Sequence, residues 1–214
     1  SADSYTYDHG LNTAIYLIAF GRHLGLPEDQ LQAIGTVGLM QDIGKLKLPR
    51  ALLDKRERLT APELKIFQGH VAQSVEILRG SKDATETLLE AVHQHHERYD
   101  GSGYPRGLKG NAISLLGQIA AIVDMFDTLT AHEPYGTHQP PSAALNYLYR
   151  NRGTKFHAGV VEQFIQCLGA FPVGSVVELN SGEIGIVMKT HAPDPHRPKV
   201  KVLLDAAGEP LASS

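Results

Sequence analysis

Histidines and aspartates of the kind that bind metal ions recur through the first 130 residues of the chain. The sequence contains eleven histidines but one cysteine and no tryptophan. Imidazole nitrogens and carboxylate oxygens are common ligands of zinc, iron and manganese, whereas one cysteine makes a thiolate site implausible. Six such residues fall on the inward faces of expected helices or at helix ends, namely His9, Asp42, His70, His95, His96 and Asp124. This pattern predicts a shared site for transition-metal ions that carries out phosphoester chemistry.

Each of the six residues also has a simpler interpretation. A single inward-facing histidine is more often hydrogen-bonded to a backbone carbonyl, and a single inward-facing aspartate more often caps a local structure. Buried charged groups without partners would, however, cost several kcal/mol each. A shared metal site therefore explains the six residues together better than six separate explanations do.

The spacing of these residues indicates two ions rather than one. His95 and His96 are adjacent, and adjacent residues on a helix point about 100° apart. They can therefore serve different ions, or approach one ion from two angles. Asp42 carries two oxygens that can bridge a pair of ions, and such a pair can clamp a transferring phosphoryl group. Lys45 can then contact a phosphate oxygen, although Lys45 alone is more simply a solvated surface residue.

The elements that must position these residues are mostly helical. Hydrophobic residues at helical spacing predict helices over about 4–24, 27–40, 60–78, 84–95, 113–130, 141–149 and 158–168. Residues 45–49 read as a connector and 96–105 as a glycine-rich loop. After Phe171 the hydrophobic residues alternate, which predicts about three strands. We therefore expect an all-α bundle over residues 1–170 and a small β extension over 171–214.

Composition limits the classes of partner. The chain has 214 residues, 42% of them hydrophobic, and a net charge of -3, which gives no general electrostatic case for a nucleic-acid polymer or an anionic membrane. Cys167 cannot form an intrachain disulfide, and the sequence shows no signal peptide, so we expect a cytoplasmic protein. Because the chain begins with serine, we expect a fragment that lacks an N-terminal regulatory region. A homodimer remains an option.

Two stretches resemble the HD-GYP family, a bacterial branch of the HD-domain metal phosphohydrolases. Residues 41–45, Gln-Asp-Ile-Gly-Lys, are similar to the family's His-Asp-Ile-Gly-Lys. Residues 95–105 match its HHE…DGxGYP stretch almost letter for letter. Asp124 and Asp127 fit the family's Asp-x-x-Asp helix, and the resemblance covers roughly residues 5–169. The GYP stretch is long enough to make a chance match very improbable.

The resemblance implies an HD-domain helical bundle that hydrolyses cyclic di-GMP to pGpG or GMP. It implies two, sometimes three, divalent ions such as iron, manganese or zinc, with Asp42 bridging and Lys45 contacting phosphate. The ligands that carry over by position are His9, Asp42, His70, His95, His96 and Asp124. The loop residues Gly101, Gly103, Tyr104 and Pro105 resemble a loop thought to shape the edge of the site and to engage GGDEF-domain proteins. A rigid surface turn is the simpler interpretation of that loop.

The departures from the family concern metal and phosphate binding. Gln41 stands where the family has a histidine ligand, so one ion should be held weakly or lost. Tyr5 stands where some members carry a glutamate ligand to a third ion, which favours a site of two ions. Glu133 and Gly136 replace two cations that many members carry, and Glu133 would repel substrate phosphates. Compensating cations are available in sequence at Arg150, Arg152 and His138.

Three hypotheses follow. The first is a metal-dependent cyclic di-GMP phosphodiesterase, weakened by the three substitutions. The second is a degenerate, non-catalytic module that binds cyclic di-GMP or docks GGDEF-domain and other signalling proteins. The third is a hydrolase of another phosphoester. Survival of six of seven usual ligands and of Lys45 favours catalysis, whereas Gln41, Glu133 and Gly136 favour the module.

Overall fold

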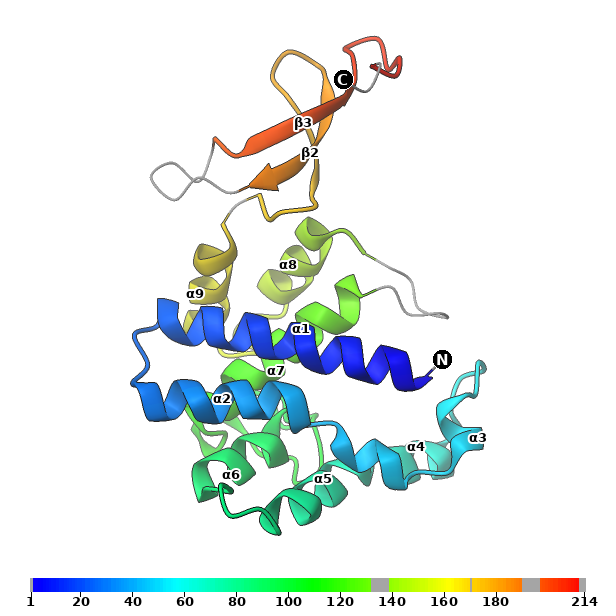
Figure 1. Ribbon diagram of the computed structural model, residues 1–214, viewed down its shortest axis with the longest axis vertical. Helices are drawn as coiled ribbons and strands as arrows, with labels where there is room; N and C mark the ends of the chain where they lie inside the picture. The colour runs from blue at the N-terminus through cyan, green and yellow to red at the C-terminus, as the bar shows by residue number, and fades with distance from the viewer. Residues whose placement is uncertain (1, 132–138, 170, 190–196, 212–214) are drawn as a thin grey trace.

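The computed structural model describes residues 2–131, 139–169, 171–189 and 197–211, with side chains from Thr6 onward. A body of helices carries a small antiparallel sheet at one end (Figure 1). The fold class expected from the sequence is therefore confirmed. Glu133, Gly136 and His138 lie outside the described residues, as does the side chain of Tyr5.

The first two helices form an antiparallel pair. They are α1 (Ala2–His23) and α2 (Glu28–Met40), joined by a turn in which Gly25 adopts a positive φ of 71°. A Cβ atom at Gly38 would lie 2.4 Å from the backbone nitrogen of Ala14, so only glycine permits this close approach. The tight crossing brings the start of α1 against the end of α2, where two of the predicted ligands lie.

The segment after α2 departs from the expected pattern. The predicted connector is a 3₁₀ helix, η1 (Ile43–Lys47), followed by the short α3 (Arg50–Leu53). The single helix expected over 60–78 is instead two helices, α4 (Ala61–Gln68) and α5 (His70–Arg79). Hydrophobic spacing continues through Gly69, so the sequence pattern alone did not reveal the break. Thr60 and Glu63 form the predicted capping box at the start of α4.

The remaining helices include α7, the helix with the most buried residues. They are α6 (Glu86–Gln94), the 3₁₀ helix η2 (Gly110–Ala112), α7 (Leu115–Thr130), α8 (Pro141–Arg150) and α9 (Ala158–Leu168). Phe20, Phe126 and Phe164 meet edge to face, with ring centroids 5.1 and 5.4 Å apart. These rings join α1, α7 and α9 into one core, which fixes α7 beside the predicted ligands.

No helix in the described ranges has both the length and the apolar character needed to cross a membrane.

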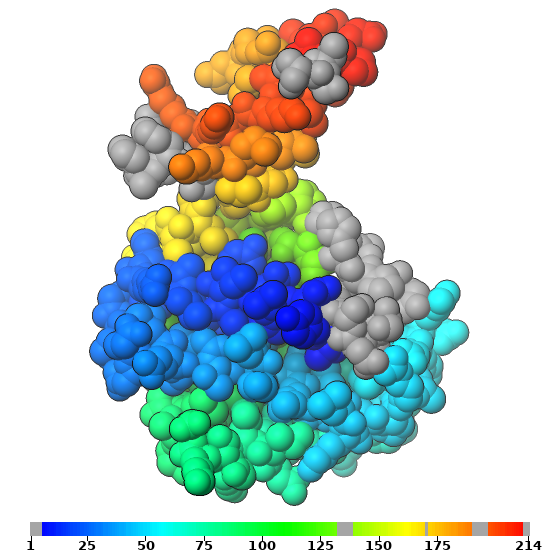
Figure 2. Space-filling view, in the orientation of Figure 1, coloured from blue at the N-terminus to red at the C-terminus, as the bar shows by residue number. Residues whose placement is uncertain are grey.

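The three strands are β1 (Val176–Glu178), β2 (Ile184–Lys189) and β3 (Lys199–Leu204). They pair antiparallel in the order β1-β2-β3, with Val177 opposite Gly185 and Gly185 opposite Val202. Gly182 supplies the positive φ, 88°, in the turn between β1 and β2. The space-filling view shows that the sheet projects from one end of the helical body (Figure 2).

Candidate metal site

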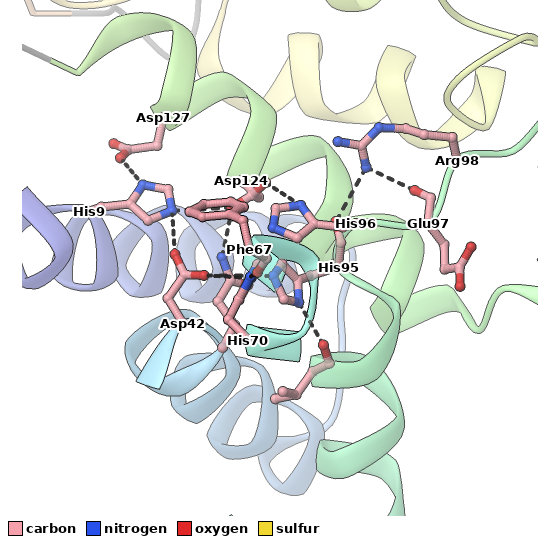
Figure 3. A network of polar contacts seen from close by, with 12 residues as sticks. His9, Asp42, Phe67, His70, His95, His96, Glu97, Arg98, Asp124 and Asp127 are labelled. Atoms are coloured by element: carbon pink, nitrogen blue, oxygen red, sulfur yellow. Dashed lines mark hydrogen bonds and ion pairs between the residues drawn. The ribbon is translucent and has the colours of Figure 1, made fainter. Parts of the chain in front are cut away.

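The structure brings all six predicted ligands together at the centre of the helical body (Figure 3). They come from elements that are distant in sequence. The residues are His9 on α1, Asp42 between α2 and η1, His70 at the start of α5, His95 and His96 at the end of α6, and Asp124 on α7. Five are buried, and His96 retains 15% of its side-chain exposure.

The potential ligand atoms form two groups that share one residue. Asp42, His70, His95 and His96 make one group, and His9, Asp42 and Asp124 make the other; within each group the atoms lie within 4.8 Å of one another. The two oxygens of Asp42 face different groups. Its Oδ1 lies 3.2 Å from His70 Nε2, whereas its Oδ2 lies 3.5 Å from His9 Nε2. Asp42 therefore belongs to both groups, which is the arrangement that a bridging ligand requires.

Hydrogen bonds orient two of the histidines toward the cluster. The Nδ1–H of His70 donates to the carbonyl oxygen of Phe67, and the Nδ1–H of His95 donates to that of Val92, both at 2.6 Å. A carbonyl oxygen can only accept, so in both rings Nδ1 carries a hydrogen and Nε2 is the nitrogen that faces the cluster. Both Nε2 atoms are buried without a hydrogen-bond partner. Lone pairs directed into a shared space are what a metal ion requires of its ligands.

His9 lies between two carboxylates of α7. Its Nδ1–H donates to Asp127 Oδ2 at 2.6 Å, and its Nε2 lies 3.2 Å from Asp124 Oδ1. Burial alone would lower the pKa of His9, but its hydrogen bonds to Asp124 and Asp127 outweigh burial and raise the pKa to about 10. Without a metal ion, His9 is therefore protonated near neutral pH. A divalent ion would displace the Nε2 proton, while Asp127 would keep the ring oriented.

Four other residues of the cluster have shifted pKa values that leave them in the protonation states of metal ligands, namely Asp42, His95, His96 and Asp124. Burial lowers the pKa of His95 to about 4 and that of His96 well below its usual range, so both rings are neutral. Burial would raise the pKa of Asp42 and Asp124, but the Lys45 ammonium holds the pKa of Asp42 well below its usual range, and the neighbouring histidines, among them protonated His9, lower the pKa of Asp124. Neutral imidazoles, ionised carboxylates and buried unpartnered nitrogens together fit divalent transition-metal ions.

Gln41 lies beside the second group. Its side chain is fully buried, and its amide Nε2–H donates to Asp124 Oδ1 at 2.9 Å. The amide oxygen of Gln41 has no hydrogen-bond partner. The residue expected to be a weak or lost ligand therefore lies next to the predicted metal ligands, and its amide oxygen is still available.

Lys45 lies where the cluster meets a cavity. Its Nζ donates to Asp42 Oδ2 at 2.7 Å and lies 5.6 Å from the centre of the Phe67 ring. A cavity of about 400 Å³ opens beside it. Its polar lining residues are Thr6, Asp42, Lys45 and Arg50, and the rest of the lining is mostly apolar, including Tyr7 and Leu46. A cation at the mouth of a largely apolar cavity suits a phosphate joined to an aromatic base.

The predicted loop packs directly on the histidines. Tyr104 lies with its ring centroid 4.7 Å from that of His96, so its side chain faces the cluster. A Cβ atom at Gly103 would lie 2.3 Å from Arg98 N, so this position requires glycine. Gly101 has a positive φ of 84°, and Pro105 is exposed. The loop therefore lies against the histidine cluster through Tyr104 and leaves Pro105 accessible at the surface.

Two further residues shape the site in ways the sequence analysis did not assign. Asp127 orients His9, as described above. Glu97 is buried, and its carboxylate accepts hydrogen bonds from the backbone N–H groups of Arg106 and Leu108 at 2.7 and 2.9 Å. These bonds hold the loop against α6. The signal for Asp127 was its spacing from Asp124 on one helix face. Glu97 belongs to the HHE part of the matched stretch, but that pattern does not reveal its hydrogen bonds to the loop.

Comparison with known proteins agrees with this geometry. A model of the HD domain matches residues 7–160, and a model of a KOW domain associated with the HD domain matches residues 176–214. A cyclic di-GMP phosphodiesterase of Pseudomonas aeruginosa is 34% identical over 206 residues, which are 96% of this chain and 50% of that protein. The cyclic di-GMP phosphodiesterase response regulator RpfG of Xanthomonas campestris is 38% identical over 67% of this chain and 38% of its own length.

A third relative carries a different substrate in its name. The 3′3′-cGAMP-specific phosphodiesterase 3 of Vibrio cholerae is 35% identical over 70% of this chain and 32% of its own length. The chain thus spans half or less of the length of these three relatives.

Solved structures share the fold at low sequence identity. An HDG"Y"P protein of Bdellovibrio bacteriovorus superposes with a TM-score of 0.61 at 20% identity, covering 74% of this chain and 51% of that chain. The HD domain of the Listeria monocytogenes phosphodiesterase PgpH, solved with cyclic-di-AMP, gives 0.57 at 15% identity, covering 77% and 88%. The matched HD model, the clustered ligands and the GYP loop together show that the chain belongs to the HD-domain family and is of the HD-GYP type.

Proposed function

We propose that this chain is a metal-dependent phosphodiesterase that hydrolyses cyclic di-GMP to pGpG or GMP. The observation that carries the proposal is the pair of ligand groups sharing Asp42 beside a cavity that Lys45 lines. Cyclic dinucleotides contain phosphodiester bonds flanked by purine bases. A cation, a cluster of potential metal ligands and a largely apolar cavity in contact with one another suit such a substrate.

The residues divide the work of catalysis between them. His70, His95 and His96 with Asp42 would hold one ion, and His9 and Asp124 with Asp42 the other. Bound divalent ions would polarise the phosphoryl oxygens and lower the pKa of a water molecule. Lys45 would hold a phosphate oxygen at the mouth of the cavity and offset charge that develops there. Tyr104 covers His96 and limits access of bulk water from the loop side.

The names of the relatives support a cyclic dinucleotide as the substrate. Two of the three relatives described above are called cyclic di-GMP phosphodiesterases, and one of them matches 96% of this chain. We prefer cyclic di-GMP over 3′3′-cGAMP for that reason.

A second candidate is a non-catalytic module, and Gln41 is the observation that favours it. An amide in place of an imidazole ligand lowers the affinity of the site for one ion, and lower occupancy of that ion reduces turnover. Such a module would bind cyclic di-GMP or dock GGDEF-domain proteins, for which Pro105 offers an exposed point on the loop. Restoring the imidazole with Gln41→His separates the candidates. If the wild type is inactive and Gln41→His gains a large turnover, the domain is one that lost catalytic activity through this substitution.

Turnover by the purified protein tests the proposal. Protein prepared without chelator is supplied with Mn²⁺ or Fe²⁺ and given cyclic di-GMP, with 3′3′-cGAMP in parallel, and products are separated by chromatography. We expect pGpG or GMP from the wild type and background turnover from Asp42→Asn, which keeps the shape but removes the bridging charge. Asp83→Asn, an exposed aspartate outside the cluster, is the matched control and should behave as wild type. A wild type that binds metal but cleaves neither nucleotide would rule out the phosphodiesterase and favour the module.

A further inference from the structure

The two ligand groups present different atoms to an ion. Asp42, His70, His95 and His96 form a nitrogen-rich group, with three imidazoles and one carboxylate. His9, Asp42 and Asp124 form an oxygen-rich group, with one imidazole and two carboxylates. Imidazole ligands suit zinc and iron, whereas carboxylate and carbonyl oxygens suit manganese and magnesium. The two halves of the site therefore differ in chemistry before Gln41 is considered.

Gln41 increases this difference. Its Nε2 lies 2.9 Å from Asp124 Oδ1, the same oxygen that lies 3.2 Å from His9 Nε2, so Gln41 adjoins the oxygen-rich group. The side chain is 0% exposed, and its Oε1 has no hydrogen-bond partner. A buried amide oxygen left without a partner is unfavourable, and a cation would satisfy it. A histidine at this position would offer the oxygen-rich group a second imidazole nitrogen, as in the nitrogen-rich group. The amide of Gln41 instead offers it a further oxygen, so the ligand atoms of the two groups differ more.

We propose that Gln41 supplies its amide oxygen to the ion of the oxygen-rich group, so that this chain holds two unlike ions. The nitrogen-rich group takes an ion such as Zn²⁺ or Fe²⁺, and the oxygen-rich group accepts a harder ion such as Mn²⁺. Zn²⁺ binds most sites more tightly than Mn²⁺ does. The difference between the two groups therefore lies in the Zn²⁺/Mn²⁺ affinity ratio, which is lower at the oxygen-rich group. The inference rests on the metal site of the proposed function, but it needs no turnover.

Metal titration of the whole chain tests this inference. Metal-free protein is loaded with one equivalent of Zn²⁺ to fill the nitrogen-rich group, and the second ion is then titrated. Binding of Mn²⁺ is followed by electron paramagnetic resonance, and binding of Zn²⁺ by competition with a chromophoric chelator. In Gln41→His we expect the Zn²⁺/Mn²⁺ affinity ratio of the second site to rise about tenfold or more. Gln41→Leu should weaken Mn²⁺ at the second site by a similar factor and leave the first Zn²⁺ unchanged.

Two further variants act as controls. Gln73 also has a buried, unpartnered amide oxygen but lies outside both groups, so Gln73→Leu should bind both ions as the wild type does. Gln41→Glu keeps the length of the side chain and adds a charge, and it should strengthen Mn²⁺ binding even if Gln41→Leu fails to fold. Circular dichroism reports whether each variant is folded.

Several outcomes would overturn the inference. A Zn²⁺/Mn²⁺ ratio in the wild type equal to that of Gln41→His would show that the amide has no effect on selectivity. Wild-type Mn²⁺ affinity in folded Gln41→Leu would show that Gln41 is not a ligand. Because no nucleotide is present, these results are independent of turnover. Unlike ions in a protein that cleaves nothing would leave the inference intact and remove only the proposed function.

Discussion

Asp42 joins the two halves of the site because each of its oxygens faces a different group of ligands. Its Oδ1 faces His70, and its Oδ2 faces both His9 and Lys45. The two carboxylate oxygens of Asp42 and the resemblance to the family both predict that it bridges two ions. The sequence could not predict that Lys45 pairs with Asp42 at 2.7 Å, because that contact depends on the turn of η1. In the present structure Lys45 stabilises the charge of Asp42, and it is within reach of the cavity.

Lys45 should matter for turnover far more than its neighbour Lys47. Lys45→Ala removes a cation from the cavity mouth, and loss of one group that stabilises developing charge typically lowers kcat by about 10²–10³-fold. Lys47 is exposed and pairs with Glu76 at 3.5 Å, so Lys47→Ala should stay within about threefold of wild type because exposed pairs contribute little. Steady-state kinetics with cyclic di-GMP measures both. Equal effects of the two substitutions would show that Lys45 does not contact the substrate.

His9 should make the metal-free protein sensitive to alkali. The carboxylates of Asp124 and Asp127 raise its folded-state pKa from 6.5 to about 10, so the protonated ring stabilises the fold. That stabilisation is complete below pH 6.5 and is lost as the pH rises to about 10. Thermal melts of chelator-treated protein should therefore show a melting temperature that falls by several degrees across this range. His9→Gln, which cannot titrate, should show a flatter profile.

Metal binding should show the opposite dependence on pH. A divalent ion must displace the Nε2 proton of His9, so affinity at the oxygen-rich group should increase between pH 6.5 and about 10. Calorimetry in buffers of different ionisation enthalpy would detect the proton released. A metal affinity that is independent of pH, or that falls as the pH rises, would show that His9 binds no ion.

At the scale of elements, the break between α4 and α5 places His70. The sequence predicted one helix here because hydrophobic residues continue through Gly69. In the structure Gly69 N–H bonds the Ile66 carbonyl in a tightened turn, and the Phe67 carbonyl accepts from His70 Nδ1. A hydrophobic pattern reports which face of a helix is buried but not whether its hydrogen bonds continue. The sequence therefore predicted which histidines and aspartates would come together, whereas the contacts that orient them depend on tertiary packing.

Gly44 provides a direct test of how η1 is held against α5. A Cβ atom at Gly44 would lie 2.1 Å from the carbonyl oxygen of His70 and 2.6 Å from Ser74 N, both backbone atoms that cannot move aside. Gly44→Ala should therefore lower the free energy of unfolding by about 1–3 kcal/mol and weaken metal binding, because Asp42 and His70 are forced apart. Gly80→Ala is the matched control, since its Cβ would meet only Ile77 O at 3.5 Å. Urea unfolding and metal titration measure the effects, and a neutral Gly44→Ala would contradict this account.

At the scale of the whole molecule, the helical body contains the main hydrophobic core and both ligand groups, and the sheet contains neither. The main hydrophobic core draws all its members from residues 16–168, and both ligand groups lie between His9 and Asp124. The sheet has little buried apolar surface of its own, with Val187 its one fully buried hydrophobic side chain among the described residues. Figure 2 shows it beyond the helices rather than between them. Alternating hydrophobic residues predicted its strands, but they could not predict where the sheet would lie.

Ending the chain after Gly169 should therefore leave a folded, metal-binding helical domain. Because no ligand and no member of the main core is removed, we expect the helical circular dichroism and the metal stoichiometry to be retained. The kcat/KM for cyclic di-GMP should stay within about threefold of the full chain, since nothing that lines the Lys45 cavity is deleted. The melting temperature should fall by only a few degrees. A truncated chain that unfolds or loses metal would show that the sheet stabilises the bundle. Intact metal binding with lost turnover would instead place part of the nucleotide-binding surface on the sheet.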